Sequence, residues 1–178
     1  ITYTEVDPET FGNVWLVPLS TPRAPVPLLQ SAANESQASI SPDGGWLAYF
    51  SSESSPAGVF LRRLSRDLRA SDVVLTVSDA NAMQPRWRAD GKELFYLERV
   101  PGSRRFNLLA VTFNETSDNP LGPPQSLFEF TVLPQLPESN AFLYSPAADG
   151  QRFLVNAYPP DSESSLELLI NWPASLAR

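Results

Sequence analysis

The pattern of apolar and polar positions predicts short strands rather than helices. Short apolar runs rich in β-branched and aromatic residues recur along the chain, and turn-forming residues bound each of them. Two such runs, Trp46–Ser51 and Glu93–Glu98, follow closely on an Asp-Gly pair, and Phe106–Thr112 is almost continuously apolar. Continuous apolar strands are typical of sheets that are covered on both faces. The chain is therefore predicted to be all-β.

One hairpin unit repeats along the chain and indicates the architecture. Residues 40–50 (ISPDGGWLAYF) and 87–97 (WRADGKELFYL) share a short strand, an Asp-Gly turn and an aromatic-rich strand, and 149–155 (DGQRFLV) is a weaker copy. The first two Asp-Gly pairs are 47 residues apart (90 − 43), and the next two are 59 apart (149 − 90). A period of about 40–50 residues is that of a β-propeller blade. We expect a β-propeller of about four blades, the first and last incomplete.

The expected blades form one unit over residues 1–178 and span residues 1–30, 38–78, 84–131 and 140–173. We expect the innermost strands of the last three blades at 39–41, 85–88 and 141–144. The first blade opens on a strand-like segment without the turn that precedes such strands elsewhere in the repeat. We therefore expect the chain to be a piece of a larger propeller.

The Asp-Gly pairs are the first candidates for chemistry, because three carboxylates could ligate a metal ion or act as acids. Their place in the repeat instead predicts a type I turn closed by a glycine bulge. In such a turn the glycine takes a positive φ, and the Asp side chain accepts hydrogen bonds from backbone N–H groups just after it. We assign them as structural turn residues, with no catalytic, cofactor-binding or metal-binding residue predicted in the chain. They are Asp43, Gly44, Asp90, Gly91, Asp149 and Gly150.

Composition narrows the chemistry further. The chain has neither cysteine nor histidine and carries a net charge of −7. A Ser-His-Asp or Cys-His device cannot be built without these residues, whereas the 20 acidic residues leave paired-carboxylate chemistry open. The negative charge disfavours nucleic acid and anionic membranes as partners. We expect no cofactor, no nucleic-acid partner and no membrane insertion by this chain. The basic pairs Arg62-Arg63 and Arg104-Arg105 are expected at solvated strand ends or loop tips.

Aromatic side chains also follow the repeat. Tyr3, Tyr49 and Tyr96 occupy the same repeat position, which predicts a layer of side chains buried between blades. Tryptophans on predicted strands could stack on carbohydrate, but packing between sheets is the expected use of such residues. These tryptophans are Trp15, Trp46, Trp87 and Trp172.

Two segments carry a resemblance to a known family. Residues 40–49 (ISPDGGWLAY) and 85–97 (PRWRADGKELFYL) resemble the WD-like propeller repeat of the bacterial TolB family. Residues 85–97 and the closing segments 149–156 and 168–172 also resemble the last propeller blades of large bacterial proteins that carry a serine/threonine kinase or winged-helix DNA-binding domain at the other end. The likeness covers residues 37–178 and implies a propeller, with an extracytoplasmic or periplasmic location favoured. The shared residues are turn and packing positions, so the resemblance supplies no catalytic or ligand residue.

Two classes of function remain. In the first, the chain is a non-catalytic propeller scaffold for protein or ligand interaction or sensing within a larger bacterial protein. In the second, it is the substrate-gating propeller of a serine peptidase, or a carboxylate-based hydrolase. A peptidase would carry a Gly-x-Ser-x-Gly nucleophile elbow in an α/β domain after the propeller. This chain has no such motif and ends soon after Trp172, which favours the first class.

The partners expected for the first class are a protein and a second copy of the chain. Open blade faces would expose large apolar patches and unpaired strand edges. We therefore expect a two-fold homodimer that buries these faces, with a compact four-bladed monomer as the rival.

Overall fold

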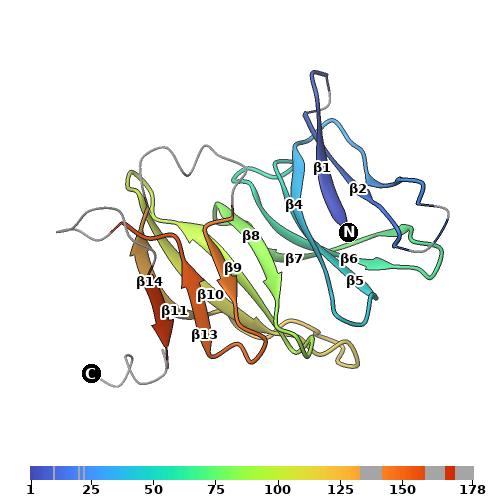
Figure 1. Ribbon diagram of the computed structural model, residues 1–178. Coiled ribbons are helices and arrows are strands. Elements are labelled where there is room, and N and C mark those ends of the chain that lie inside the picture. The colour runs from blue at the N-terminus through green and yellow to red at the C-terminus, as the bar shows by residue number, and fades with distance from the viewer. Residues whose placement is uncertain (10, 20, 22, 133–141, 159–166, 171–178) are drawn as a thin grey trace. The chain divides into compact units, whose positions relative to one another are not determined.

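The computed structural model describes residues 1–178 except 10, 20, 22, 133–141, 159–166 and 171–178 (Figure 1). All the strands of the described residues lie in antiparallel sheets, which confirms the all-β prediction. The chain divides into two compact units, Ile1–Pro85 and Arg86–Arg178. In the part that the structure describes, no helix is long and apolar enough to cross a membrane.

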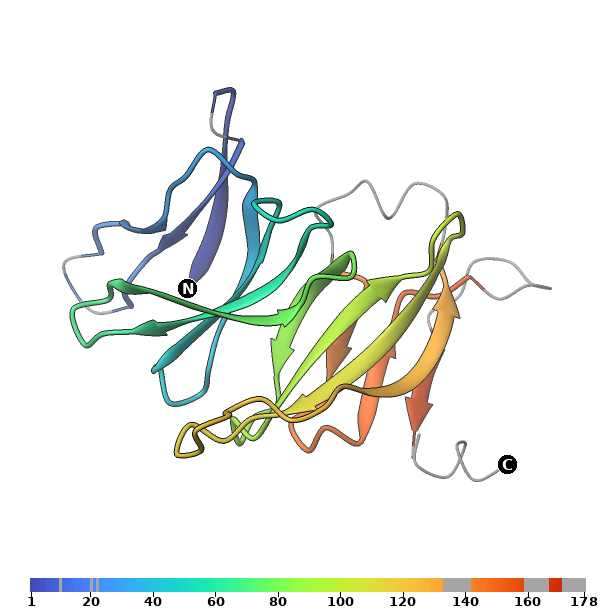
Figure 2. The same ribbon diagram turned by 180° about the vertical axis from the view of Figure 1, so that it is seen from behind.

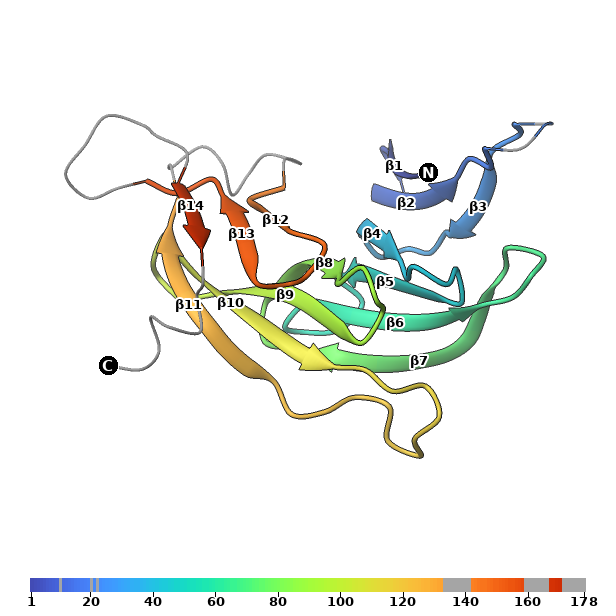
Figure 3. The same ribbon diagram turned by 60° about the horizontal axis from the view of Figure 1, so that its bottom comes forward.

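The first unit holds a three-stranded and a four-stranded meander. The strands of the first sheet are β1 (Thr2–Asp7), β2 (Phe11–Leu16) and β3 (Val26–Leu29). Those of the second are β4 (Glu35–Ile40), β5 (Trp46–Ser51), β6 (Gly58–Leu64) and β7 (Ala70–Ser78). Strand β4 lies next to β1 and β2 (Figure 3). Side chains of both sheets share one apolar core. Its buried members are Val14, Leu16, Leu28, Leu29, Leu47, Tyr49, Phe60 and Leu64.

The second unit repeats this plan. Its first sheet holds β8 (Ala82–Trp87), which begins before the division between the units, together with β9 (Glu93–Arg99), β10 (Arg105–Thr112) and β11 (Gln125–Thr131) (Figure 2). Strands β12 (Tyr144–Pro146), β13 (Arg152–Val155) and β14 (Glu167–Ile170) form the last sheet. The Phe153 ring packs edge-on against Phe95 and Phe128, at centroid distances of 5.0 and 5.7 Å. Successive antiparallel meanders of this kind are the blades of a β-propeller.

The innermost strands differ from the prediction. Strands β4 and β8 begin at Glu35 and Ala82, earlier than the expected 39–41 and 85–88. Both strands contain a glutamine with a φ of +56°, Gln37 and Gln84. A residue in this left-handed conformation breaks the alternation of side chains, so the hydrophobic pattern hides the start of the strand. In the last sheet, β12 is Tyr144–Pro146 rather than 141–144, because Tyr144 pairs with Val155 and Pro146 with Phe153; residue 141 lies outside the described residues.

The predicted tyrosine layer is confirmed at two of its three positions. Tyr49 and Tyr96 are buried, with exposed fractions of 1% and 0%. Tyr3 is 41% exposed, and the prediction was wrong there. Its ring stacks on Trp15 at 6.5 Å between centroids, because the β1–β2 register pairs the two residues on one face of the sheet. Trp15, Trp46 and Trp87 lie on strands as predicted, whereas Trp172 lies outside the described residues.

Candidate functional site

The three Asp-Gly pairs fold into the same turn. The N–H of Gly44, Gly91 and Gly150 donates to the carbonyl three residues earlier, at 2.9, 3.0 and 2.9 Å. The φ angles of these glycines are +77°, +72° and +69°. A side chain is disfavoured at such angles, which is why the repeat keeps glycine there.

The three carboxylates are engaged inside these turns. Each Asp Oδ1 accepts a hydrogen bond from the backbone N–H two residues on, as turn chemistry predicts. The distances are 3.1 Å from Gly45 to Asp43, 3.0 Å from Lys92 to Asp90, and 2.9 Å from Gln151 to Asp149. Among the described residues, no three or more Asp or Glu side chains gather as a metal site would require. These carboxylates therefore shape hairpins.

The turn of the second sheet is held by a buried serine. The Ser41 hydroxyl donates to Asp43 Oδ1 and accepts a hydrogen bond of 2.9 Å from the Trp46 N–H. The hydrogen bond from Ser41, followed by that from Gly45, lowers the pKa of the Asp43 carboxyl below its ordinary value. The hydroxyl thus links the start of the turn to the strand that follows it.

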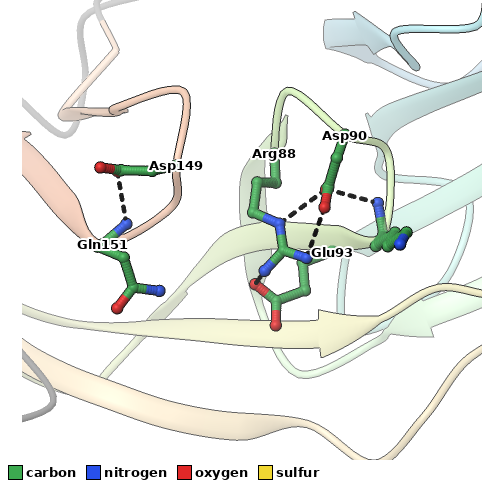
Figure 4. A network of polar contacts seen from close by, with 6 residues as sticks. Arg88, Asp90, Glu93, Asp149 and Gln151 are labelled. Carbon is green, nitrogen blue, oxygen red and sulfur yellow. Dashed lines mark hydrogen bonds and ion pairs between the residues drawn. The ribbon is translucent and has the colours of Figure 1, made fainter.

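The turn of the third sheet replaces that serine by an arginine. Arg88 stands 47 positions after Ser41. It donates two hydrogen bonds to Asp90, from Nε to Oδ1 at 2.7 Å and from Nη2 to Oδ2 at 2.8 Å (Figure 4). A third nitrogen, Nη1, donates to Glu93 Oε2 at 2.6 Å. The Arg88 hydrogen bond is the largest cause that lowers the pKa of Asp90 to about 2. Bidentate pairs of this geometry are the strong form of the salt bridge.

The last turn packs directly against this network. A Cβ added to Gly150 would lie 2.7 Å from Arg88 Cδ and 3.1 Å from Phe95 Cζ. Asp149 is turned toward its own loop and bonds Gln151 rather than Arg88 (Figure 4). Two constraints therefore favour glycine at position 150: its positive φ and the close approach of the Arg88 side chain.

A buried carboxyl group in the first unit escaped the sequence reading. Glu35 is 1% exposed, and its Oε2 atom has no hydrogen-bond partner in the described part of the chain. Burial raises the pKa of Glu35, while the Arg62 charge and a hydrogen bond from the Ser31 hydroxyl act in the opposite direction. One signal was available: Ala82 occupies the corresponding repeat position, 47 residues on, so a glutamate there departs from the repeat.

Arg62 interacts with this buried carboxyl group through its charge. It does not lie at a solvated strand end, so the expectation for Arg62 was wrong. It lies on β6, half-buried, and its Nε donates to Tyr49 Oη at 2.9 Å. Its guanidinium carbon is 5.7 Å from the centre of the Tyr49 ring. Burial raises the pKa of Tyr49, against the lowering effect of this hydrogen bond. Arg62 thus bonds the buried Tyr49, and its charge acts on the buried Glu35.

An open cavity of about 590 Å³ lies at one end of the second sheet. It is formed by the β4–β5 turn at Gly45 and by the β6–β7 hairpin, and we call it the arginine pocket. The arginine pocket is lined by Gly45, Arg63, Leu64, Ser65, Arg66, Arg69, Ala70 and Ser71. The sequence pattern did not reveal it, because one side comes from a turn some twenty residues earlier in the chain.

Comparisons with known proteins support the propeller fold. No protein-family model and no curated protein sequence matches the chain. Among solved structures it is similar to a putative TolB from Agrobacterium tumefaciens, with a TM-score of 0.55 and 16% identity over 74% of this chain and 46% of that one. It is also similar to the Cps50 (Swd1) β-propeller domain of Myceliophteria thermophila, with a TM-score of 0.52 and 10% identity over 96% of this chain and 54% of that one. A third likeness is to a prolyl endopeptidase structure, with a TM-score of 0.51 and 14% identity over 96% of this chain and 28% of that one.

These likenesses define the class of protein by its fold. The chain is built of β-propeller blades that resemble those of TolB and WD-type propellers. It spans about half the length, or less, of the propeller-containing chains that it matches.

Proposed function

We propose that the chain is a non-catalytic propeller scaffold that binds a partner or ligand within a larger protein. The observation that carries this proposal is the lining of the arginine pocket. The residues that line this cavity include three arginines and two serines as hydrogen-bond donors and no Asp or Glu. A cavity with several convergent donors and no general base suits recognition rather than hydrolysis.

The buried carboxyl group supports the same conclusion. Glu35 is the strongest candidate for an acid catalyst, since its pKa is raised and a hydroxyl and a guanidinium lie near it. A general acid has to come within hydrogen-bond distance of its substrate. At 1% exposure, the carboxyl group cannot be reached without opening the core. A structural role for Glu35 accounts for all of its contacts.

The experiment that tests this proposal compares wild type with Glu35→Gln across peptidase, esterase, glycosidase and phosphatase substrates. We expect no turnover above the buffer blank from either protein. Turnover that Glu35→Gln abolishes, in a variant with an unchanged circular dichroism spectrum, would establish the carboxylate-based hydrolase instead. Turnover that survives in the variant would place catalysis elsewhere and would equally overturn a non-catalytic scaffold.

One observation favours a second candidate, the gating propeller of a serine peptidase. It is the fold likeness to a prolyl endopeptidase structure, at 14% identity. A likeness at this level concerns the fold alone, and unrelated functions share the propeller. A parent gene that encodes a Gly-x-Ser-x-Gly elbow in an adjoining α/β domain would favour this candidate. A parent gene that encodes no such elbow would favour the non-catalytic scaffold.

A further inference from the structure

We propose that the arginine pocket binds a phosphoryl group, a tetrahedral anion with several acceptor oxygens. This inference rests on the proposed binding function and names the chemistry of the ligand. It concerns the cavity between the β4–β5 turn and the β6–β7 hairpin, all within residues 1–85.

The first argument is the supply of hydrogen-bond donors. Arg66 and Arg69 are exposed, and within the described residues neither guanidinium has a hydrogen-bond or ion-pair partner. A guanidinium offers five N–H donors and no acceptor. The hydroxyls of Ser65 and Ser71 already accept the N–H of Arg69 and of Val73, both at 3.1 Å, so each keeps its own proton to donate. The polar side chains of the pocket therefore match a ligand group that only accepts.

The second argument is the position of the third arginine. The guanidinium carbon of Arg63 lies 5.4 Å from the centre of the Trp46 ring, and its charge contributes to the lowered pKa of Asp43. An arginine stacked on an aromatic ring loses less conformational freedom when it binds an anion. Arg63 thus supplies an anchored positive charge beside the two exposed arginines.

The third argument is the local charge. Of the four arginines in residues 62–72, Arg62 bonds Tyr49 and the other three line the pocket; the segment also holds two aspartates, in a chain whose net charge is −7. The aspartates, Asp67 and Asp72, are not among the residues that line the pocket. A positive cavity on an acidic protein concentrates anions at one place and disfavours their binding elsewhere.

The fourth argument is that the backbone around the pocket is already held in place. The Ser65 N–H donates to Arg69 at 2.9 Å, and the Leu68 N–H donates to Ser65 at 3.0 Å, which closes the hairpin. The Leu64 N–H donates to Gly45 at 2.8 Å and ties the hairpin to the β4–β5 turn. Binding then orders only side chains, and preorganisation of this kind favours affinity.

The geometry favours phosphate over carboxylate. One carboxylate satisfies one guanidinium fork, whereas a phosphate monoester presents three acceptor oxygens and about two negative charges. The volume of about 590 Å³ leaves room for a ligand larger than an isolated phosphate ion. That ligand is either a phosphorylated small molecule or a phosphorylated side chain of a protein.

The test is isothermal titration calorimetry of the whole chain with four probes: inorganic phosphate, a hexose phosphate, a phosphoserine peptide and the same peptide without phosphate. The double variant Arg66→Gln/Arg69→Gln is compared with Arg99→Gln/Arg104→Gln, which removes the same charge from exposed arginines outside the pocket. We expect wild type and the control variant to bind phosphorylated probes alike. The pocket variant should lose about tenfold or more in affinity, since charge-assisted hydrogen bonds are lost.

The two sources of the phosphoryl group are separated by the probes. Binding of the phosphopeptide alone assigns a phosphoprotein, and binding of the hexose phosphate alone assigns a small molecule. No binding of any phosphorylated probe, equal loss in both double variants, or equal binding of the unphosphorylated peptide would overturn the inference. Free phosphate released from the phosphopeptide would instead contradict the non-catalytic function and leave the binding site standing.

Discussion

The side chain of Gln37 accepts a hydrogen bond from the backbone N–H of Gln84, with its Oε1 2.8 Å from that nitrogen. The two residues are 47 positions apart, the same separation as Asp43 and Asp90, and both have a φ of +56°. One side chain thus joins β4 to β8 at the residues where each strand takes the left-handed conformation.

Two substitutions at Gln37 separate the hydrogen bond from the backbone conformation. Gln37→Ala removes the acceptor and should lower the free energy of unfolding by about 1–2 kcal/mol. Gln37→Gly removes the acceptor too but relieves the left-handed φ, so it should be less destabilising than alanine by about 1 kcal/mol. Urea denaturation measures both. An alanine variant as stable as wild type would show that water replaces the bond at no cost.

The buried tyrosines should contribute far more to stability than the exposed one. Tyr49→Ala and Tyr96→Ala should each lower the free energy of unfolding by about 3–5 kcal/mol, because they leave large cavities. Tyr3→Ala is the matched control and should cost less than about 1 kcal/mol, since Tyr3 is 41% exposed. Equal losses at all three positions in urea denaturation would contradict the burial of only two of them.

The ion pair of Asp90 should appear in the pH dependence of stability. The pKa of Asp90 is lowered from 3.8 to about 2 in the folded chain, chiefly by Arg88. A lowered pKa stabilises the folded state above the unfolded value, and this contribution disappears as the pH falls from about 4 to about 2. Asp90→Asn keeps a turn-forming side chain but loses the charge.

The measurement is the difference in unfolding free energy between wild type and Asp90→Asn at several pH values. Wild type should be the more stable protein near neutral pH, and the difference should shrink through the acid range. Asp90 is 45% exposed, so solvent screening keeps the effect modest. A difference that stays constant down to pH 2 would show that Arg88 does not hold the carboxylate ionised.

Two glycines test whether packing adds to backbone strain. Gly44 and Gly150 have φ angles of +77° and +69°, but only Gly150 would place its new Cβ against Arg88 and Phe95. Gly44→Ala should cost about 1–2 kcal/mol from the left-handed backbone alone. Gly150→Ala should cost about 1–3 kcal/mol more, as overpacking does. Thermal unfolding of the two variants gives the comparison, and equal melting temperatures would contradict the tight contact.

Exposed apolar residues of the first sheet bear on self-association. Tyr3 on β1 and Phe11 at the start of β2 are exposed apolar residues of this sheet, with exposed fractions of 41% and 59%. We propose that they contribute to the contact between two copies, because burial of exposed apolar side chains is favourable. Tyr3→Ser/Phe11→Ser should weaken the dimer, whereas Val73→Ser, which changes an exposed valine on β7, should not. Light scattering that finds wild type as a monomer of 19.6 kDa at micromolar concentration would reject the dimer.

The local features of the fold followed from the sequence by itself. The Asp-Gly spacing predicted the hairpin turns, because a turn is decided by a few adjacent residues whose φ angles and side-chain hydrogen bonds are local. The limits of β5 also agreed with the apolar run Trp46–Ser51, since a strand covered on both faces leaves a clear pattern. The class of fold followed from the repetition of these units.

Only the tertiary structure decided which side chains meet. Arg62 was expected at a solvated strand end and Glu35 drew no prediction, because their burial depends on how a first sheet packs on a second. The same holds for Tyr3, whose exposure no repeat position could reveal, and for the arginine pocket, whose walls come from two separate hairpins. Contacts between residues distant in sequence depend on strand register, bulges and packing, which the period of the hydrophobic pattern does not encode.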